Sequence, residues 1–79
     1  MTRISPLPGD IWIHTRNGSR YRILAVGLNA ITSQREVIYE PLYFCQFSHF
    51  TRQLENHPKA FLSDNAAGQP RFTLEKEGP

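Results

Sequence analysis

The chain has only one cysteine, Cys45, among its 79 residues, which excludes an intramolecular disulfide. Its longest uninterrupted apolar run covers 23–26, far short of the roughly 20 residues that span a bilayer. The first residues lack the pattern of a secretory signal peptide. The sequence also contains no phosphate-binding glycine loop, no nucleophile elbow and no pair of acids at a recognisable catalytic spacing. These absences predict a cytoplasmic, non-membrane protein that is not an enzyme and needs no cofactor.

The length predicts one small domain with a limited core. We expect an irregular entry segment over 1–9, a single domain over 10–76 and a tail over 77–79. Cys45, His49 and His57 lie within thirteen residues of one another. Their spacing lacks the paired ligands of structural zinc sites, so we expect no metal site.

Two extended apolar runs flank Asn17-Gly18, the dipeptide that best tolerates the positive φ angles of a two-residue type I′ turn. This pattern predicts a β-hairpin. With that turn, Trp12 would lie opposite Ile23 and His14 opposite Tyr21. One face of the hairpin would then carry the following residues, and we expect it to point inward: Trp12, His14, Tyr21, Ile23 and Ala25.

Further segments alternate as strands do. We expect Gly27 to mark a bend or bulge in the second strand, since a glycine inside a strand often has that use. The third strand is predicted over 36–43, with Val37 and Tyr39 on one face. The remaining predictions are a strand-like segment over 45–54, a turn or single 3₁₀ turn over 55–58, a loop over 63–69 and a closing strand over 71–75. Together they predict an all-β, five-stranded barrel of the SH3-like type, with an OB-type barrel as the alternative.

Four stretches then resemble a known family: GDIWIHTRNGSRYRILAV, VIYEPLY, FTRQLENHPKAF and PRFTLE. In this order and spacing they are similar to the bacterial and phage family of small domains of unknown function numbered sixteen fifty-three. The matching positions are His14, Gly18, Tyr21, Tyr39, Tyr43, Arg52, Leu54, Glu55, Pro70, Arg71 and Phe72. The chain departs from the family pattern at Trp12-Ile13, Phe50, Gln53 and Asn56-His57. The resemblance implies an SH3-like barrel with no established biochemical activity.

Nine aromatic residues are many for this length, and aromatic grooves of small barrels bind peptides, cations or bases. We expect Phe47, Phe50 and Phe72 to fill the core, since phenylalanine has no polar tip. His14 with Arg52 and Glu55 could bind an anion, or could form a structural network in which His14 donates to a carboxylate or carbonyl and Arg52 pairs with Glu55 or another acid. The leading prediction is a non-catalytic module that recognises a protein or peptide partner. Its predicted site residues are Trp12, His14, Tyr21, Tyr39, Tyr43 and Arg52.

The alternative is a nucleic-acid-binding barrel. Residues 1–35 hold five arginines and one acid, whereas 36–79 hold four basic and six acidic residues. In this alternative Arg16, Arg20 and Arg22 would contact phosphates while aromatic rings stack on bases. A solvated arginine face without a ligand is the competing interpretation. The sequence leaves the oligomeric state open, a homodimer included.

Overall fold

A computed structural model describes residues 5–78, which form five strands: β1 (Ile11–His14), β2 (Arg20–Leu28), β3 (Arg35–Pro41), β4 (Phe50–Gln53) and β5 (Phe72–Lys76). They make one antiparallel sheet in the order β4-β3-β2-β1-β5. The predictions of an all-β chain and of five strands are confirmed. Residues 5–78 contain no helix, and therefore none that could cross a membrane. The turn predicted over 55–58 lies two residues later, over 57–60, where Ala60 N donates to His57 O at 3.0 Å.

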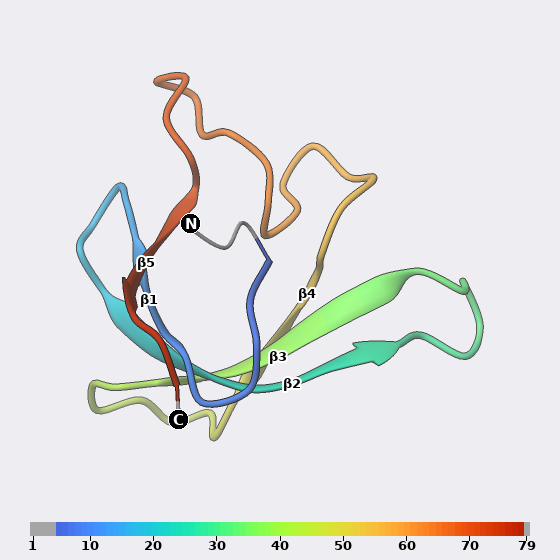
Figure 1. The fold of residues 1–79 in the computed structure, drawn as a ribbon, viewed down its shortest axis with the longest axis horizontal. Coiled ribbons are helices and arrows are strands. Elements are labelled where there is room, and N and C mark those ends of the chain that lie inside the picture. Colours follow the sequence, from blue (N-terminus) through green and yellow to red (C-terminus); the bar gives the residue numbers. More distant parts are fainter. Residues whose placement is uncertain (1–4, 79) are drawn as a thin grey trace.

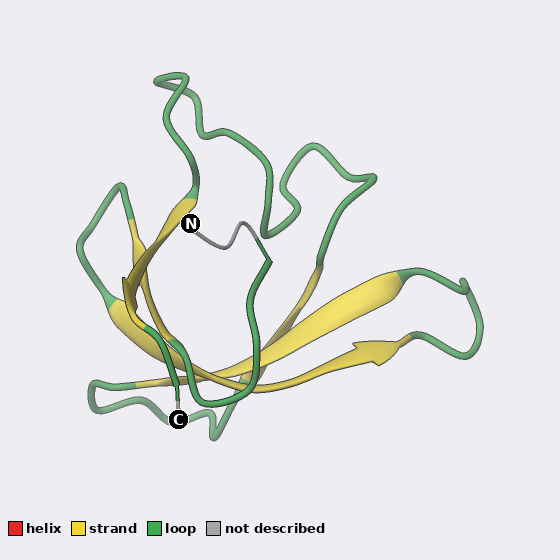
Figure 2. Cartoon of the chain, viewed as in Figure 1, coloured by secondary structure: helices red, strands yellow, loops and turns green. Residues whose placement is uncertain are grey.

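The sheet curls so that its two edge strands, β4 and β5, lie on opposite sides of the interior (Figure 1; Figure 2). Strand pairing does not close it into a barrel. The connection from β4 to β5 spans the opening instead: Phe61 N donates to Gln53 O at 2.8 Å, and Arg71 N donates to Ser63 O at 2.9 Å. We call this opening between β5 and residues 61–64 the seam.

The core lies on the concave face and is largely aromatic. Its buried residues are Trp12, Tyr21, Ile23, Val37, Tyr39, Leu54, Phe61 and Phe72. Phe61 and Phe72 stack with ring centroids 4.2 Å apart. The predicted core position is confirmed for Phe72, and Phe50 is half-buried against the core. It is wrong for Phe47, which is 57% exposed, because the fourth strand begins only at Phe50 and the preceding residues form a loop.

The predicted hairpin exists, but its register is two residues away from the expected one. Trp12 pairs with Tyr21, not with Ile23. The loop has four residues, 15–18: Gly18 N donates to His14 O and only Gly18 has a positive φ, at 75°. The Asn17 side chain accepts from Ser19 N, which stabilises this longer turn in place of the type I′ turn. A two-residue shift keeps every side chain on its face, so the inward face was predicted correctly up to Ile23.

Beyond Ile23 the predicted inward face, which included Ala25, is wrong. The register of β2 against β3 shifts between Ile23 and Ala25, which places a bulge at Leu24. Gly27 pairs regularly with Glu36 and is not the bulge. The bulge turns Val26 toward the same face as its partner Val37 and moves Ala25 off the inward face.

Asp10 ties the two ends of the described chain together. It is 1% exposed, and its carboxylate accepts from Leu7 N at 2.8 Å, Trp12 Nε1 at 3.3 Å and Gly78 N at 2.8 Å. The backbone of Gly78 lies so close to Gly9 that an added Cβ would sit 2.6 Å from the Gly9 carbonyl carbon. Residue 78 therefore packs against the entry segment.

Candidate functional site

Three of the aromatic residues predicted to contact a partner belong to the core. Trp12, Tyr21 and Tyr39 are 4%, 8% and 5% exposed. Each lies on the concave face of a different strand: Trp12 on β1, Tyr21 on β2 and Tyr39 on β3. Burial of a large ring there stabilises the fold. The rings of Tyr21 and Tyr39 therefore offer almost no surface to a partner, which corrects that part of the prediction, and the small exposed part of Trp12 lies in the wall of a pocket described below. Tyr43 is 45% exposed, and His14 and Arg52 are half-buried.

The hydroxyls of Tyr21 and Tyr43 lie 3.0 Å apart. Burial, with the neighbouring Tyr43 hydroxyl, raises the pKa of Tyr21 to about 12. Tyr43 thus connects an exposed loop to the core through a polar contact between neutral phenols.

Two of the three arginines of the predicted nucleic-acid surface are ion-paired on the outer face of the sheet. Arg20 donates through Nε and Nη2 to Glu75, and Arg22 Nη1 lies 2.8 Å from Glu40. Arg16 lies exposed in the hairpin loop and has no carboxylate partner within residues 5–78.

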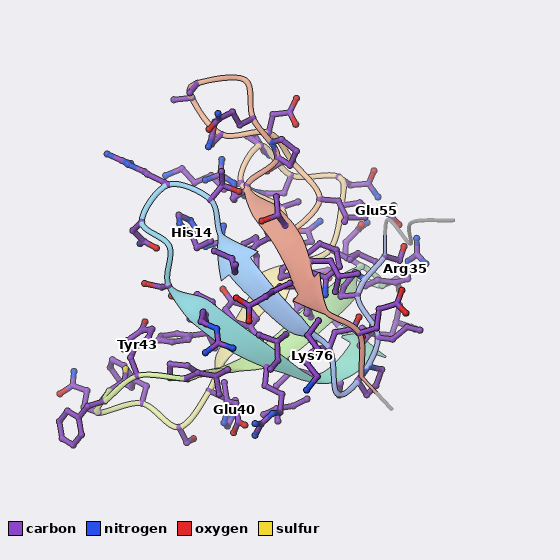
Figure 3. All side chains as sticks on the ribbon, turned by 60° about the vertical axis from the view of Figure 1, so that its left-hand side comes forward. His14, Arg35, Glu40, Tyr43, Glu55 and Lys76 are labelled. Atoms are coloured by element: carbon purple, nitrogen blue, oxygen red, sulfur yellow. The ribbon has the colours of Figure 1, made fainter. Side chains whose placement is uncertain are left out.

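The expected pairing of Arg52 with Glu55 is also wrong. Glu55 pairs with Arg35, on the side of the molecule away from Tyr43 (Figure 3). The side chain of Arg52 turns to the concave face, since Arg52 pairs with the buried Val37 across β3 and β4. There it donates to Tyr39 OH at 3.2 Å and to Lys59 O at 2.6 Å.

His14, at the end of β1, and Arg52, on the edge strand β4, contact the same aromatic ring. The His14 ring meets Phe72 edge to face at 5.0 Å, and the Arg52 guanidinium carbon lies 5.3 Å from the centroid of Phe72. Burial lowers the pKa of His14 below its ordinary value, and the positive charges of Arg52, Arg71 and Arg16 lower it further. Nδ1 of His14 is buried and has no hydrogen-bond partner in the described part of the chain, so this nitrogen does not make the predicted bond to a carboxylate or carbonyl there.

A pocket of about 490 Å³ opens at the seam. Its walls are mainly apolar and come from β1, β5 and the segment before β5, among them Trp12, Phe61, Leu62 and Leu74. Arg71 stands in its wall, held by Ser63 Oγ at 3.0 Å. Sequence reasoning missed this pocket, because no pattern predicted that the β4–β5 connection bridges the two sheet edges.

A second exposed apolar surface is the loop over 42–49, between β3 and β4. It presents Tyr43, Phe44 and Phe47, and Phe44 is fully exposed. Tyr43 lies at one end of the sheet in Figure 3. Exposed apolar groups in such a cluster are typical of interaction surfaces. We call this segment the aromatic loop.

Comparison of the chain with known protein families, curated proteins and solved structures finds no match. The resemblance to the small-domain family therefore stays a prediction.

Proposed function

We propose that this chain is a small SH3-like binding module, non-catalytic, that takes an extended protein or peptide segment into the seam pocket. The observation that carries the proposal is the position of that apolar pocket along the outer edge of β5.

The SH3-like description is supported by the strand order β4-β3-β2-β1-β5, a meander of four strands with the last strand paired to the first. In this interpretation the segment 61–64 replaces direct pairing of the two sheet edges. The resemblance of the chain to the small bacterial and phage domain family agrees with the same fold, and we propose membership on those grounds.

The edge of β5 offers hydrogen bonds as well as apolar contact. Arg71 O accepts from Thr15 N at 2.9 Å, so this carbonyl points toward β1. Carbonyl directions alternate along a strand, which turns those of Phe72 and Leu74 toward the seam. An extended segment that added to this edge would pair with the backbone while one of its apolar side chains entered the pocket.

Nucleic-acid binding is the weaker alternative. Arg20 and Arg22 already pair with carboxylates, and contact with a phosphate would require that each pair be broken. The rings of Trp12, Tyr21 and Tyr39 are buried and would not stack on bases.

The experiment is selection from a displayed library of random peptides on the immobilised chain, followed by affinity measurements on two leucine variants. Leu62 lines the pocket and is 38% exposed, whereas Leu24 is 42% exposed on β2 and is not among the pocket-lining residues. Leu62→Asp should abolish binding of the selected peptide, and Leu24→Asp should leave it unchanged.

Three other results would overturn the proposal. The first is a library that yields no binder. The second is equal binding by both aspartate variants with loss of binding on Phe44→Ser, which would assign recognition to the aromatic loop. The third is selective binding of oligonucleotides that weakens steeply as salt rises, which would favour the alternative.

A further inference from the structure

The arginines of the described chain fall into two groups. Arg20 and Arg22 pair with Glu75 and Glu40 on the outer face of the sheet, and Arg35, at the start of β3, pairs with Glu55. The other three have no carboxylate partner within residues 5–78: Arg16, Arg52 and Arg71.

The second group lies around His14: Arg16 is in the hairpin loop that follows His14, and Arg71 O accepts from Thr15 N, the residue next to His14, at 2.9 Å. The three guanidinium groups come from the hairpin loop, from β4 and from the residue before β5, and the positive charge of each acts on the His14 ring. Arg52 and His14 contact the same Phe72 ring. A cluster of like charges without a counter-charge is electrostatically unfavourable, unless an anion neutralises it.

Neutral acceptors hold two of these guanidinium groups in place. Arg52 uses Nε and Nη1 to bond Tyr39 OH and Lys59 O. Arg71 uses Nε and Nη2 to bond Ser63 Oγ and Asp64 O, the latter at 3.2 Å. Each guanidinium keeps further N–H donors for a ligand, and its orientation is already fixed, which reduces the entropy lost on binding.

We propose that Arg16, Arg52 and Arg71, together with His14, form a binding site for an oxyanion, the carboxylate or phosphorylated side chain of the protein segment that occupies the seam pocket. This proposal rests on the proposed function for its choice of a protein ligand. Arg71 connects the two sites, since it also lines the pocket. The partner segment therefore carries an acidic group beside its apolar anchor, and the forked guanidinium group suits either kind of oxyanion.

His14 is the reporter for the first test. The charged groups that act on it are Arg16, Arg52 and Arg71, while Asn17 opposes their effect. A bound anion offsets these positive charges, so the NMR-measured pKa of His14 should rise when inorganic phosphate or acetate replaces chloride at equal ionic strength. The rise should saturate with anion concentration, and a larger effect of one probe would distinguish phosphate from carboxylate.

Variants that each remove one positive charge separate a site from general charge effects. Arg16→Gln, Arg52→Gln and Arg71→Gln should each weaken phosphate binding about three- to tenfold, within the range of charge-assisted hydrogen bonds at a partly exposed site. Arg20→Gln, on the outer face, should leave it unchanged. Arg16 makes no hydrogen bond or ion pair within the described residues, so its variant stays informative even if Arg52→Gln disturbs the fold.

The last arm uses a peptide selected on the seam, with its acidic residue changed to the amide. A three- to tenfold loss of affinity for wild-type chain, absent in Arg71→Gln, would support the site. A peptide that binds the pocket equally well with and without its acid would overturn the oxyanion site and leave the proposed function standing. Linear, non-saturating shifts of His14 with phosphate, or equal losses in Arg20→Gln, would overturn it as well.

Discussion

Replacement of the buried Asp10 by alanine should be among the most destabilising substitutions of a polar residue in this chain. Within residues 5–78 the carboxylate accepts from the N–H groups of Leu7, Trp12 and Gly78, which lie 3, 2 and 68 residues away along the chain. Alanine would remove the acceptor of these donors. Because Asp10 is only 1% exposed, water has little access to replace it.

The magnitude follows from the cost of an unsatisfied donor, about 1–3 kcal/mol when it is buried. The amides of Leu7 and Gly78 are part-buried and can regain a water, so the lower end applies to them. Three donors at about 1 kcal/mol each give a loss of about 3 kcal/mol. A domain of this size is stable by about 4–12 kcal/mol, so the loss is a large fraction of the whole.

The assay is urea unfolding followed by tryptophan fluorescence, with Asp64→Ala as the matched control. Asp64 is exposed and its carboxylate makes no hydrogen bond or ion pair within residues 5–78, so its variant should stay within about 0.5 kcal/mol of wild type. An Asp10→Ala chain within about 1 kcal/mol of wild type would refute the reasoning, because the three hydrogen bonds would then carry little of the stability.

Three further predictions concern other parts of the fold. The pKa of His14 is lowered in the folded chain, so the unfolded chain takes up a proton first as the pH falls. The free energy of unfolding should therefore decrease as pH drops below the ordinary value of 6.5. Urea midpoints of wild type and His14→Gln across that range test this, and equal pH dependence of the two would contradict it. Tyr21→Phe should cost about 1 kcal/mol through loss of the contact with the Tyr43 hydroxyl, and ultraviolet titration should show one phenol ionising near 12 in wild type only. Gly78→Ala should lower the melting temperature because its Cβ would meet backbone at 2.6 Å, whereas Gly27→Ala, with no atom within 4 Å, should not; a similar effect of both would count against the tight packing of the C-terminal residues.

The sequence was sufficient for the strands and for the inward face near the hairpin, because alternation of apolar residues reports directly on burial. It was insufficient for register. Asn17-Gly18 fits a two-residue turn and also the longer turn that the chain adopts, and both leave Trp12 and Tyr21 inward. The bulge at Leu24 has no local signature, whereas the glycine at 27 suggested one where the pairing is regular.

The candidate site was harder to predict than the fold. Tyrosine and tryptophan serve equally well in a core and in a groove, and only the three-dimensional structure shows that Trp12 and Tyr39 are buried. The role of Arg71 depends on the bridging of the seam by residues far along the chain. The separation of paired from unpaired arginines depends on cross-strand neighbours such as Glu75 beside Arg20, which follow from strand order and not from local sequence.

Whether a partner segment lies along the edge of β5 is tested most directly by amide hydrogen exchange of the chain with and without a selected peptide. We predict slower exchange at Phe72 and Leu74, whose backbone groups face the seam, together with chemical-shift changes at Leu62. Exchange that slows only within 42–49, with β5 unchanged, would contradict the claim and place the partner on the aromatic loop.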